Sequence, residues 1–188
     1  MKIGILGGTF NPPHIGHLVL AQEMLEQLRL DKIFFIPTNN PPHKKGKQLE
    51  PKKRFLMAKL AVSENPKFEV LDLELKRKGK SYTVDTIVEL KNRYPKDSFY
   101  LIIGSDLAKY FRKWKNPDKI KKMVTVIVAK RRGSSFRSSK SFKQMDIIQI
   151  ELSSSQIRER IKKGKTVKYL VPERVENYIK KNNIYKRI

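Results

Sequence analysis

Two histidines follow a glycine pair near the start of the chain. His14 and His17 stand three residues apart, after Gly7 and Gly8, which close the apolar segment 2–6. Glycines let a phosphate group approach the backbone closely, and the first turn of a helix offers free N–H groups and a positive dipole end. Side chains three residues apart share one face of a helix. This pattern predicts a cradle for a triphosphate or pyrophosphate.

A histidine pair could instead bind a metal ion. Zinc would need a further ligand, and the only other histidine is His43. All 3 histidines fall in the first 43 of 188 residues, beside Pro-Pro-His segments that follow two successive apolar runs. Packing alone would scatter them. The sequence therefore favours phosphate binding, and we expect no metal site built from protein side chains alone.

The composition predicts one globular domain, residues 1–188. Hydrophobic residues make up 39% and charged residues 32% of the chain. There is no cysteine, which excludes disulfides, thiolate metal sites and a cysteine nucleophile, and which is typical of the cytoplasm. No apolar run approaches the ~18 residues of a membrane span, and the N-terminus lacks the apolar core of a signal peptide. We therefore expect a cytoplasmic protein that does not bind membranes.

The formal net charge of +24 indicates anionic partners or substrates. Residues 1–108 hold 18 basic and 12 acidic side chains, whereas residues 109–188 hold 24 and 6. A basic second half could bind nucleic acid, but its aromatic residues follow no stacking pattern and no known nucleic-acid-binding motif occurs. We favour a solvated basic surface that attracts small anions over nucleic-acid binding.

Apolar runs alternate with amphipathic helical patterns along the chain. Strands are expected at 2–6, 32–37, 68–75, 99–103, 124–129 and 146–152, and helices at 17–30, 51–62, 83–94, 154–163 and 172–181, with short helical pieces near 106–114 and 117–123. Most of these strands are apolar throughout, which is typical of parallel strands covered on both faces. We predict an α/β fold, a Rossmann-like doubly wound parallel sheet with a small C-terminal helical subdomain at about 153–188. The serine-rich segment 133–143 is expected to be a surface loop, with phosphate binding as a lesser alternative.

A second phosphate-binding signal lies near the end of the chain. Ser153 followed by Gln156 is a capping-box pattern, so a helix should begin at Ser154. Its first turn would offer free N–H groups and the planar fork of Arg158, which suits phosphate oxygens. Helix capping with a solvated arginine is the simpler alternative, and both can hold together.

Five segments in order resemble a known family. The segment from Gly7 to Leu18, GGTFNPPHIGHL, looks like the HxGH signature of the nucleotidyltransferases, and in particular of the bacterial nicotinate mononucleotide adenylyltransferases. The other four are IPTNNPPHK (36–44), SYTVDT (81–86), GSD (104–106) and SSSQIR (153–158). Trp114 follows soon after the GSD segment. Ser155 replaces the usual threonine and keeps its hydroxyl.

The resemblance implies that ATP and nicotinate mononucleotide react to give deamido-NAD and pyrophosphate, with Mg²⁺ accompanying ATP. It assigns His14, His17 and Arg158 to catalysis. Its ATP-binding residues would be Gly7, Gly8, Thr9, Phe10, Gly104, Asp106, Ser154 and Ile157. Its mononucleotide-binding residues would be Thr9, Asn11, Asn39, Lys44, Ser81, Tyr82, Thr83, Asp106 and Trp114.

Several of these residues also have purely structural interpretations. Asp106 and the segment 81–83 could only cap helices, and Trp114 could be a core residue instead of the plane on which a pyridine ring stacks. A phosphate monoester is already an anionic nucleophile, so the predicted reaction needs no general base and proceeds by in-line attack without a covalent intermediate.

Other functions were weighed against this one. Related nucleotidyltransferases use pantetheine phosphate, nicotinamide mononucleotide or cytidylyl groups, and comparison of candidate acceptors would separate them. Residues 14–17 spell HIGH, as in class I aminoacyl-tRNA synthetases, but no KMSKS segment follows. RNA binding without enzymatic activity is a third alternative, and the formation of a homo-oligomer is left open.

Overall fold

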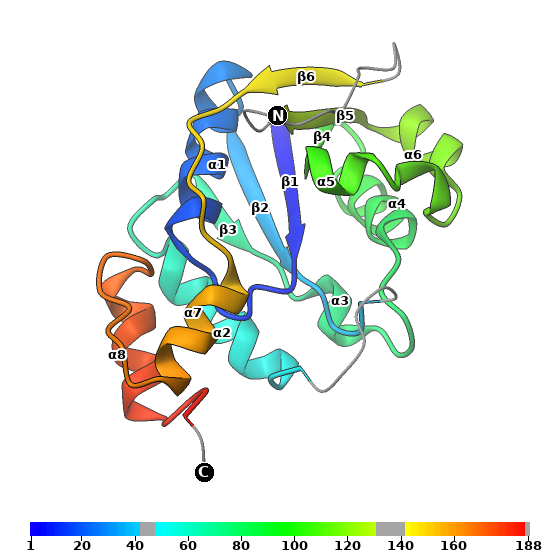
Figure 1. Ribbon diagram of the computed structural model, residues 1–188. Helices are drawn as coiled ribbons and strands as arrows, with labels where there is room; N and C mark the ends of the chain where they lie inside the picture. The colour runs from blue at the N-terminus through cyan, green and yellow to red at the C-terminus, as the bar shows by residue number, and fades with distance from the viewer. Residues whose placement is uncertain (42–47, 131–141, 187–188) are drawn as a thin grey trace.

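The computed structural model describes residues 1–41, 48–130 and 142–186. Its centre is a parallel sheet with the strand order β3-β2-β1-β4-β5-β6 (Figure 1). The strands are β1 (Lys2–Gly8), β2 (Lys32–Pro37), β3 (Phe68–Val70), β4 (Ser98–Gly104), β5 (Thr125–Lys130) and β6 (Lys143–Asp146). All five pairings are parallel. From β1 the chain builds the sheet outward to β2 and β3 on one side, and to β4, β5 and β6 on the other. This confirms the predicted doubly wound α/β fold.

Helices cover both faces of the sheet. They are α1 (Ile15–Gln27), α2 (Pro51–Val62), α3 (Leu73–Lys76), α4 (Thr83–Arg93), α5 (Ser105–Ala108), η1 (Phe111–Lys113), α6 (Pro117–Met123), α7 (Ser154–Lys162) and α8 (Glu173–Lys181). Ile3 and Ile5 of β1 pack with α3, α4 and α6, whereas Leu6 packs with α1 and α2. Alternate residues of one strand thus enter two cores, which explains why the strands are apolar throughout.

Two expected strands are placed differently in the structure. The segment 68–75 is a strand only as far as Val70, and its remainder turns into α3, where Leu73 is fully buried. The strand expected at 146–152 lies earlier, because β6 pairs with β5 in a register that ends at Lys130 opposite Asp146. Among the described residues, this is the last pair between the two strands. Of the serine-rich segment 133–143, residues 133–141 lie outside the described residues.

The C-terminal helices pack on α2, at the end of the sheet where β1 finishes (Figure 1). Ile157 of α7 and Val175 of α8 are buried with Met57 of α2. The predicted capping box opens α7: the Gln156 N–H donates to Ser153 Oγ at 3.2 Å, and the Ser153 N–H donates to Gln156 Oε1 at 2.8 Å. Within the described ranges, none of the helices has the length and apolar character to cross a bilayer.

Candidate active site

The residues predicted to bind substrates follow the carboxyl ends of three adjacent strands. The loop from Thr9 to His14 follows β1, Asn39 follows β2, and Asp106 lies in α5 directly after β4. Since these strands are neighbours and parallel, their ends meet at one edge of the sheet. Ligands bind at this edge in open parallel sheets, where the strand order reverses.

The histidine pair is built at the start of α1. His14 is the extended residue before the helix, and its ring centroid lies 3.7 Å from that of His17. The His14 N–H donates to His17 Nδ1 at 3.1 Å. A ring nitrogen that accepts a hydrogen bond carries no proton, so the proton of a neutral His17 is on Nε2. That nitrogen is therefore a donor of the kind that binds a phosphate oxygen.

The space beside Gly16 is taken up by the His14 ring. A Cβ atom at this position would lie 3.1 Å from His14 Nδ1 and 3.2 Å from His14 Cε1. These distances are tighter than most Cβ contacts, so a side chain here would require the imidazole to shift by a few tenths of an ångström. The glycine of the HxGH motif thus keeps the two rings together.

The Phe10 side chain packs against the ring of His17. Its backbone has a φ of 47° and its side chain is 2% exposed. The ring lies edge-on to His17, with centroids 5.1 Å apart, and contacts Phe35. A Cβ at Gly8 would lie 3.0 Å from the same ring. The Phe10 side chain is therefore buried against protein beside His17, and a contact between Phe10 and ATP stays a prediction.

The Asn11 side chain is bonded to protein at both of its polar atoms. The residue is 5% exposed; its Nδ2 donates to Gln48 Oε1 at 3.1 Å and its Oδ1 accepts from Tyr185 Oη at 2.6 Å. These contacts anchor the loop after β1, and the role of Asn11 in binding the mononucleotide stays a prediction.

The first turn of α7 docks against that same loop. Ser154 Oγ donates to the Pro12 carbonyl at 2.8 Å, and Arg158 donates to the Asn11 carbonyl at 2.8 Å. Segments more than 140 residues apart in sequence thus meet two residues before His14. The second Arg158 nitrogen lies 3.0 Å from Ser155 Oγ. The structure therefore brings the two predicted phosphate-binding signals together.

Ile157 does not face this site. Its side chain is fully buried with Met57 and Val175, and its N–H donates to the Ser153 carbonyl within the helix. Its assignment to ATP binding stays a prediction, which the buried side chain and the bonded amide do not support.

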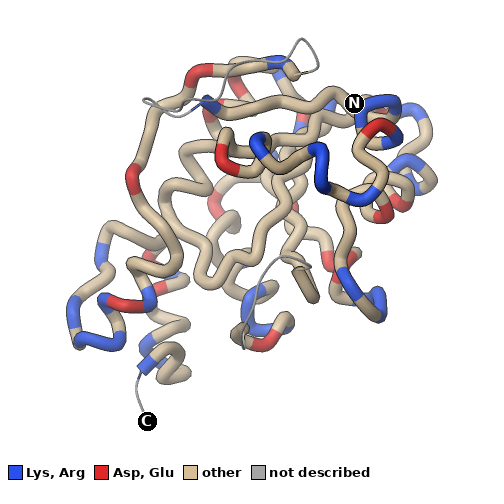
Figure 2. The backbone as a smooth tube through the Cα atoms, turned by 45° about the vertical axis from the view of Figure 1, so that its right-hand side comes forward, with Lys and Arg blue, Asp and Glu red and all other residues tan. Residues whose placement is uncertain are grey.

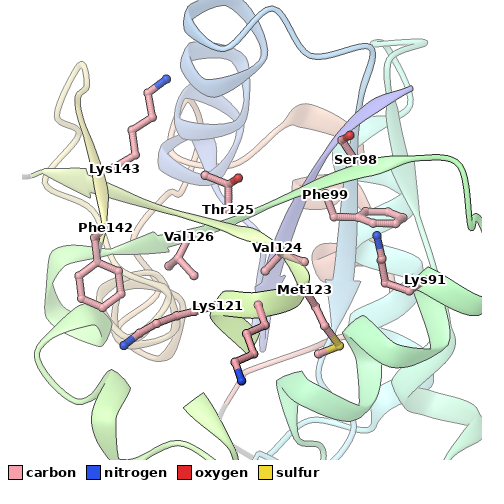
Figure 3. Close-up of a pocket in the computed structure, with 11 residues that line it drawn as sticks. Lys91, Ser98, Phe99, Lys121, Met123, Val124, Thr125, Val126, Phe142 and Lys143 are labelled. Carbon is pink, nitrogen blue, oxygen red and sulfur yellow. The ribbon is translucent and has the colours of Figure 1, made fainter. Parts of the chain in front are cut away.

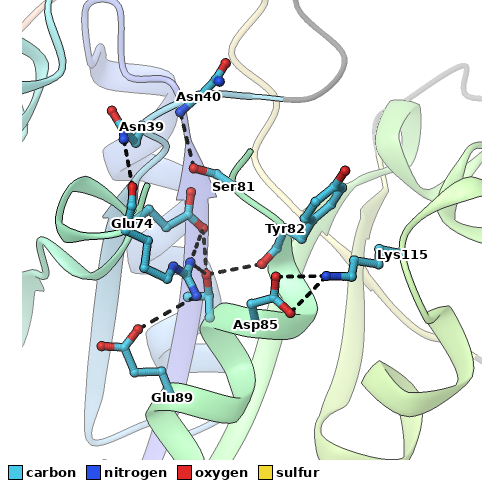
Figure 4. Close-up of polar contacts among 10 residues, drawn as sticks. Asn39, Asn40, Glu74, Ser81, Tyr82, Asp85, Glu89 and Lys115 are labelled. Carbon is cyan, nitrogen blue, oxygen red and sulfur yellow. Dashed lines mark hydrogen bonds and ion pairs between the residues drawn. The ribbon is translucent and has the colours of Figure 1, made fainter. Parts of the chain in front are cut away.

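A second group of predicted residues surrounds the start of α4 (Figure 4). The Ser81 N–H donates to the Asn40 carbonyl at 3.0 Å, and the Asn40 N–H donates to Ser81 Oγ at 3.2 Å. Tyr82 precedes the helix and Thr83 is its first residue, while Asn39 Nδ2 donates to the Arg77 carbonyl at 3.2 Å. The loop after β2 is thereby tied to the N-terminus of α4.

The remaining predicted residues lie around these two groups. Trp114 is half-buried, with its ring 5.1 Å from that of Phe111, so it packs on the core and also keeps an exposed part. Gly7 is the second-last residue of β1 and Gly104 is the last of β4, and within the described part of the chain no atom approaches within 4 Å of a Cβ built on either. Lys44 lies outside the described residues.

Arg54 is a positioning residue that sequence analysis missed. It is fully buried in α2, and its guanidinium donates to four backbone carbonyls, those of Leu49, Thr9, Thr38 and Asn39, at 2.7–3.1 Å. Burial lowers its pKa, and nearby Tyr185 and Glu74 oppose that shift. It therefore clamps the loops after β1 and β2. Arg54 shares a helix face with Met57, Ala58 and Ala61, and that apolar spacing was the available signal.

Tyr185 was also missed. Its hydroxyl anchors Asn11, and burial raises the pKa of the Tyr185 phenol, against the influence of Arg158 and Arg54. No motif surrounds this residue in the sequence, so only the folded chain shows its role.

A separate hollow of about 600 Å³ lies at the other end of the sheet (Figure 3). Its walls include the amino ends of β4 and β5, at Ser98 and Thr125, and the lysines Lys91, Lys121, Lys122 and Lys143. None of the predicted site residues lines it among those described. The hollow is therefore distinct from the edge at which the histidines lie.

A family model and curated relatives assign the chain to the same family. A family model described as cytidylyltransferase-like matches residues 5–160. A protein of Oceanobacillus iheyensis named probable nicotinate-nucleotide adenylyltransferase is 45% identical over 184 residues, covering 98% of this chain and 96% of the relative. One of Dictyoglomus thermophilum with the same name is 46% identical over 194 residues, covering 98% and 100%.

Solved structures show the same fold. The Plasmodium falciparum nicotinic acid mononucleotide adenylyltransferase complexed with NaAD aligns with a TM-score of 0.81 at 23% identity, over 98% of this chain and 97% of that one. The same protein complexed with APC aligns with a TM-score of 0.80 at 22% identity, over 98% and 96%.

Proposed function

The chain belongs to the cytidylyltransferase-like family and, within it, to the nicotinate-nucleotide adenylyltransferases, and we propose that the edge formed by β1, β2 and β4 carries out adenylyl transfer. ATP and nicotinate mononucleotide are the substrates, and deamido-NAD and pyrophosphate are the products, a step of NAD biosynthesis. One observation carries the assignment of the site: α7 docks Ser154 and Arg158 onto the loop that leads to His14 and His17.

In the proposed reaction the acceptor's 5′-phosphate attacks the α-phosphorus of ATP in line. The new P–O bond forms as the bond to the β-phosphate oxygen breaks, and pyrophosphate leaves with that electron pair. A phosphate monoester is already anionic, so no side chain needs to remove a proton. Catalysis then depends on orientation and on stabilising charge on the phosphoryl oxygens.

The phosphate chain is assigned to two groups of donors. His14 and His17 bind the triphosphate, and the Nε2 proton of His17 is directed at the α-phosphate. Ser154 and Arg158 bind the β- and γ-phosphates at the positive end of α7. Lys44 is proposed to neutralise the acceptor phosphate.

The acceptor's pyridine ring and carboxylate are assigned to the start of α4. Tyr82 and Thr83 supply N–H groups and Ser81 supplies its hydroxyl for the carboxylate, since the Ser81 N–H is bonded to the Asn40 carbonyl. The exposed part of Trp114 supplies a stacking surface. Asp106 after β4 is proposed to contact the nucleotides, as are the Gly104, Gly7 and Thr9 backbones.

Mg²⁺ is proposed to arrive with ATP. Across residues 1–41, 48–130 and 142–186, no three His, Asp or Glu side chains lie close enough together to hold a metal ion. Magnesium usually keeps several waters and binds substrate phosphates, so this donor set fits an ion held mainly by the ATP phosphates. When bound, it neutralises phosphate charge.

We also place the reaction in the cytoplasm, which the absence of cysteine supports.

Pyrophosphate release tests the proposal. Purified protein with ATP and Mg²⁺ should release pyrophosphate with nicotinate mononucleotide and form deamido-NAD. Parallel reactions with nicotinamide mononucleotide, phosphopantetheine and a nucleoside monophosphate serve as controls. Faster release with one of these acceptors would replace the substrate assignment, and release with none of the four would reject the function.

A further inference from the structure

A buried carboxyl lies behind the proposed acceptor site. Glu74 of α3 is 6% exposed and faces the first turn of α4 (Figure 4). Thr86 Oγ1 donates to Glu74 Oε1 at 2.8 Å, and the Arg77 guanidinium lies 3.8 Å from the same oxygen. Arg77 also donates to Thr86 Oγ1. These three residues, Glu74, Arg77 and Thr86, are called the buried triad below.

The buried triad is connected to both sides of the acceptor site. Thr86 Oγ1 lies 3.4 Å from the carbonyl of Tyr82, one turn earlier in the chain. The carbonyl of Arg77 accepts from Asn39 at the end of β2. A shift of the Glu74 carboxyl would therefore move the first turn of α4 and the loop after β2 together.

The triad has the features of a functional cluster instead of ordinary packing. A buried carboxyl is costly unless its oxygens are bonded. Within the described residues Glu74 Oε2 has no partner that meets hydrogen-bond geometry, and the Ser81 hydroxyl is the nearby group that favours its charged form. Buried groups kept at such a cost, beside a site, are candidates for a role in function.

We propose that Glu74 is a positioning residue for the acceptor, which holds the start of α4 and Asn39 in the shape that receives the carboxylate of nicotinate mononucleotide. This inference rests on the proposed function and deepens it. Glu74 touches neither substrate; it acts through Thr86 and Arg77. Its removal should weaken acceptor binding and leave ATP binding at α1 and α7 unchanged.

The charge of Glu74 adds a pH dependence. Burial raises the pKa of this carboxyl above its ordinary value, while the hydroxyls of Thr86 and Ser81 and the charges of Arg77 and Arg54 oppose the shift. Arg77 also faces Glu89, with 3.7 Å between NH1 and Oε2. Below its pKa Glu74 is neutral; above it, a negative charge lies behind the start of α4. An anionic acceptor carboxylate should therefore bind more weakly as the pH rises through that pKa.

The test compares variants by steady-state kinetics. Glu74→Ala should raise the KM for nicotinate mononucleotide about tenfold, the usual effect of losing a hydrogen bond to a charged group, with kcat and the KM for ATP within about twofold. Glu74→Gln keeps an oxygen for Thr86 and should restore most of the affinity. It should also remove the rise of KM with pH that Glu74 causes. The acceptor's own ionisation affects the wild type and Glu74→Gln equally, so it cancels in the ratio of their two KM values.

Glu69→Gln is the matched control, because Glu69 of β3 forms a half-exposed ion pair with Lys32 of β2. It should match the wild type. If Glu74→Ala does not fold, Thr86→Val removes the same hydrogen bond and should give the same rise in KM. An unchanged acceptor KM, or an equal rise for ATP, would overturn the inference. A wild-type enzyme inactive on nicotinate mononucleotide would instead overturn the proposed function.

Discussion

At the residue scale, one hydrogen bond sets the chemistry of the histidine pair. Because the His14 backbone donates to His17 Nδ1, the second imidazole presents Nε2–H to its surroundings. We propose that this N–H donates to a phosphate oxygen of the triphosphate in the transition state. His17 is therefore the side chain whose loss should most affect the transition state.

His17→Ala should lower kcat by about 10²–10³, the usual effect of removing one transition-state donor. The fold should persist, since His17 is only half-buried. Single-turnover formation of deamido-NAD measures the effect, and circular dichroism checks the fold. A folded variant with near-normal kcat would reject this role.

Arg54 is a second residue whose role the structure decides. Arg54→Met should leave four partly buried carbonyls without their guanidinium donor and lower the free energy of unfolding by about 3 kcal/mol. Urea unfolding measures the loss. Lys53→Met, its exposed neighbour, is the control and should change stability by less than about 0.5 kcal/mol. Equal effects of the two substitutions would show that the clamp contributes nothing.

At the element scale, the site depends on where α1 and α7 begin. Ser153 and Gln156 fix the start of α7, and the close approach of the two imidazoles fixes the start of α1. Both helices present their first turns to the loop after β1. The positive ends of two helix dipoles therefore point toward the same region.

Gly16→Ala separates stability from activity at the start of α1. Alanine favours helix over glycine by about 1 kcal/mol, so the thermal midpoint should not fall. The new Cβ would nevertheless displace the His14 ring, and kcat should fall about tenfold, as one misplaced phosphate donor would cause. Thermal unfolding and pyrophosphate release on the same sample measure both. Full activity in the stabilised variant would contradict the steric argument.

The sequence predicts most of these elements for local reasons. The helix 51–62 begins at Pro51 and the helix after Ser153 begins at its capping box, because both signals are local. The β3–α3 segment and β6 were misplaced because strand ends depend on partners. Leucines alternate through 71–75, yet only 68–70 lie beside β2. No local pattern carries that information.

The same distinction applies to the site. His14, His17, Ser154 and Arg158 were predicted and lie around one loop. Arg54, Tyr185 and Glu74 were not, because each acts on backbone or side chains distant in sequence. Asn11 and Phe10 belong to the recognised motif, but their side chains support it from within. The motif thus predicts where the site lies, and the packing shows which of its side chains are buried against protein.

At the scale of the whole molecule, the charge is spread over many elements. Figure 2 shows Lys and Arg on several helices and loops instead of on one stripe. A field of this kind attracts small anions from many directions, and salt screens it over about 10 Å at 0.1 M. The net charge of +24 thus suits a site whose substrates are all phosphates.

Raising ionic strength from about 0.05 to 0.5 M should lower kcat/KM for nicotinate mononucleotide several-fold while kcat stays nearly constant. The value of kcat/KM should fall because salt screens the attraction that brings the anionic substrate to the enzyme. The value of kcat should stay nearly constant because screening leaves the bound complex intact. Initial rates over a salt series, with the Mg²⁺ concentration fixed, measure it. A flat kcat/KM would show that the basic surface plays no part in substrate capture.

The central claim is that the starts of α1 and α7 bind one triphosphate together. A crystal structure with Mg²⁺ and a non-hydrolysable ATP analogue tests it most directly. We expect phosphate oxygens within hydrogen-bonding distance of both His17 Nε2 and the Arg158 guanidinium. A triphosphate that touches only one of them, or that lies instead in the lysine-lined hollow at the other end of the sheet, would contradict the account.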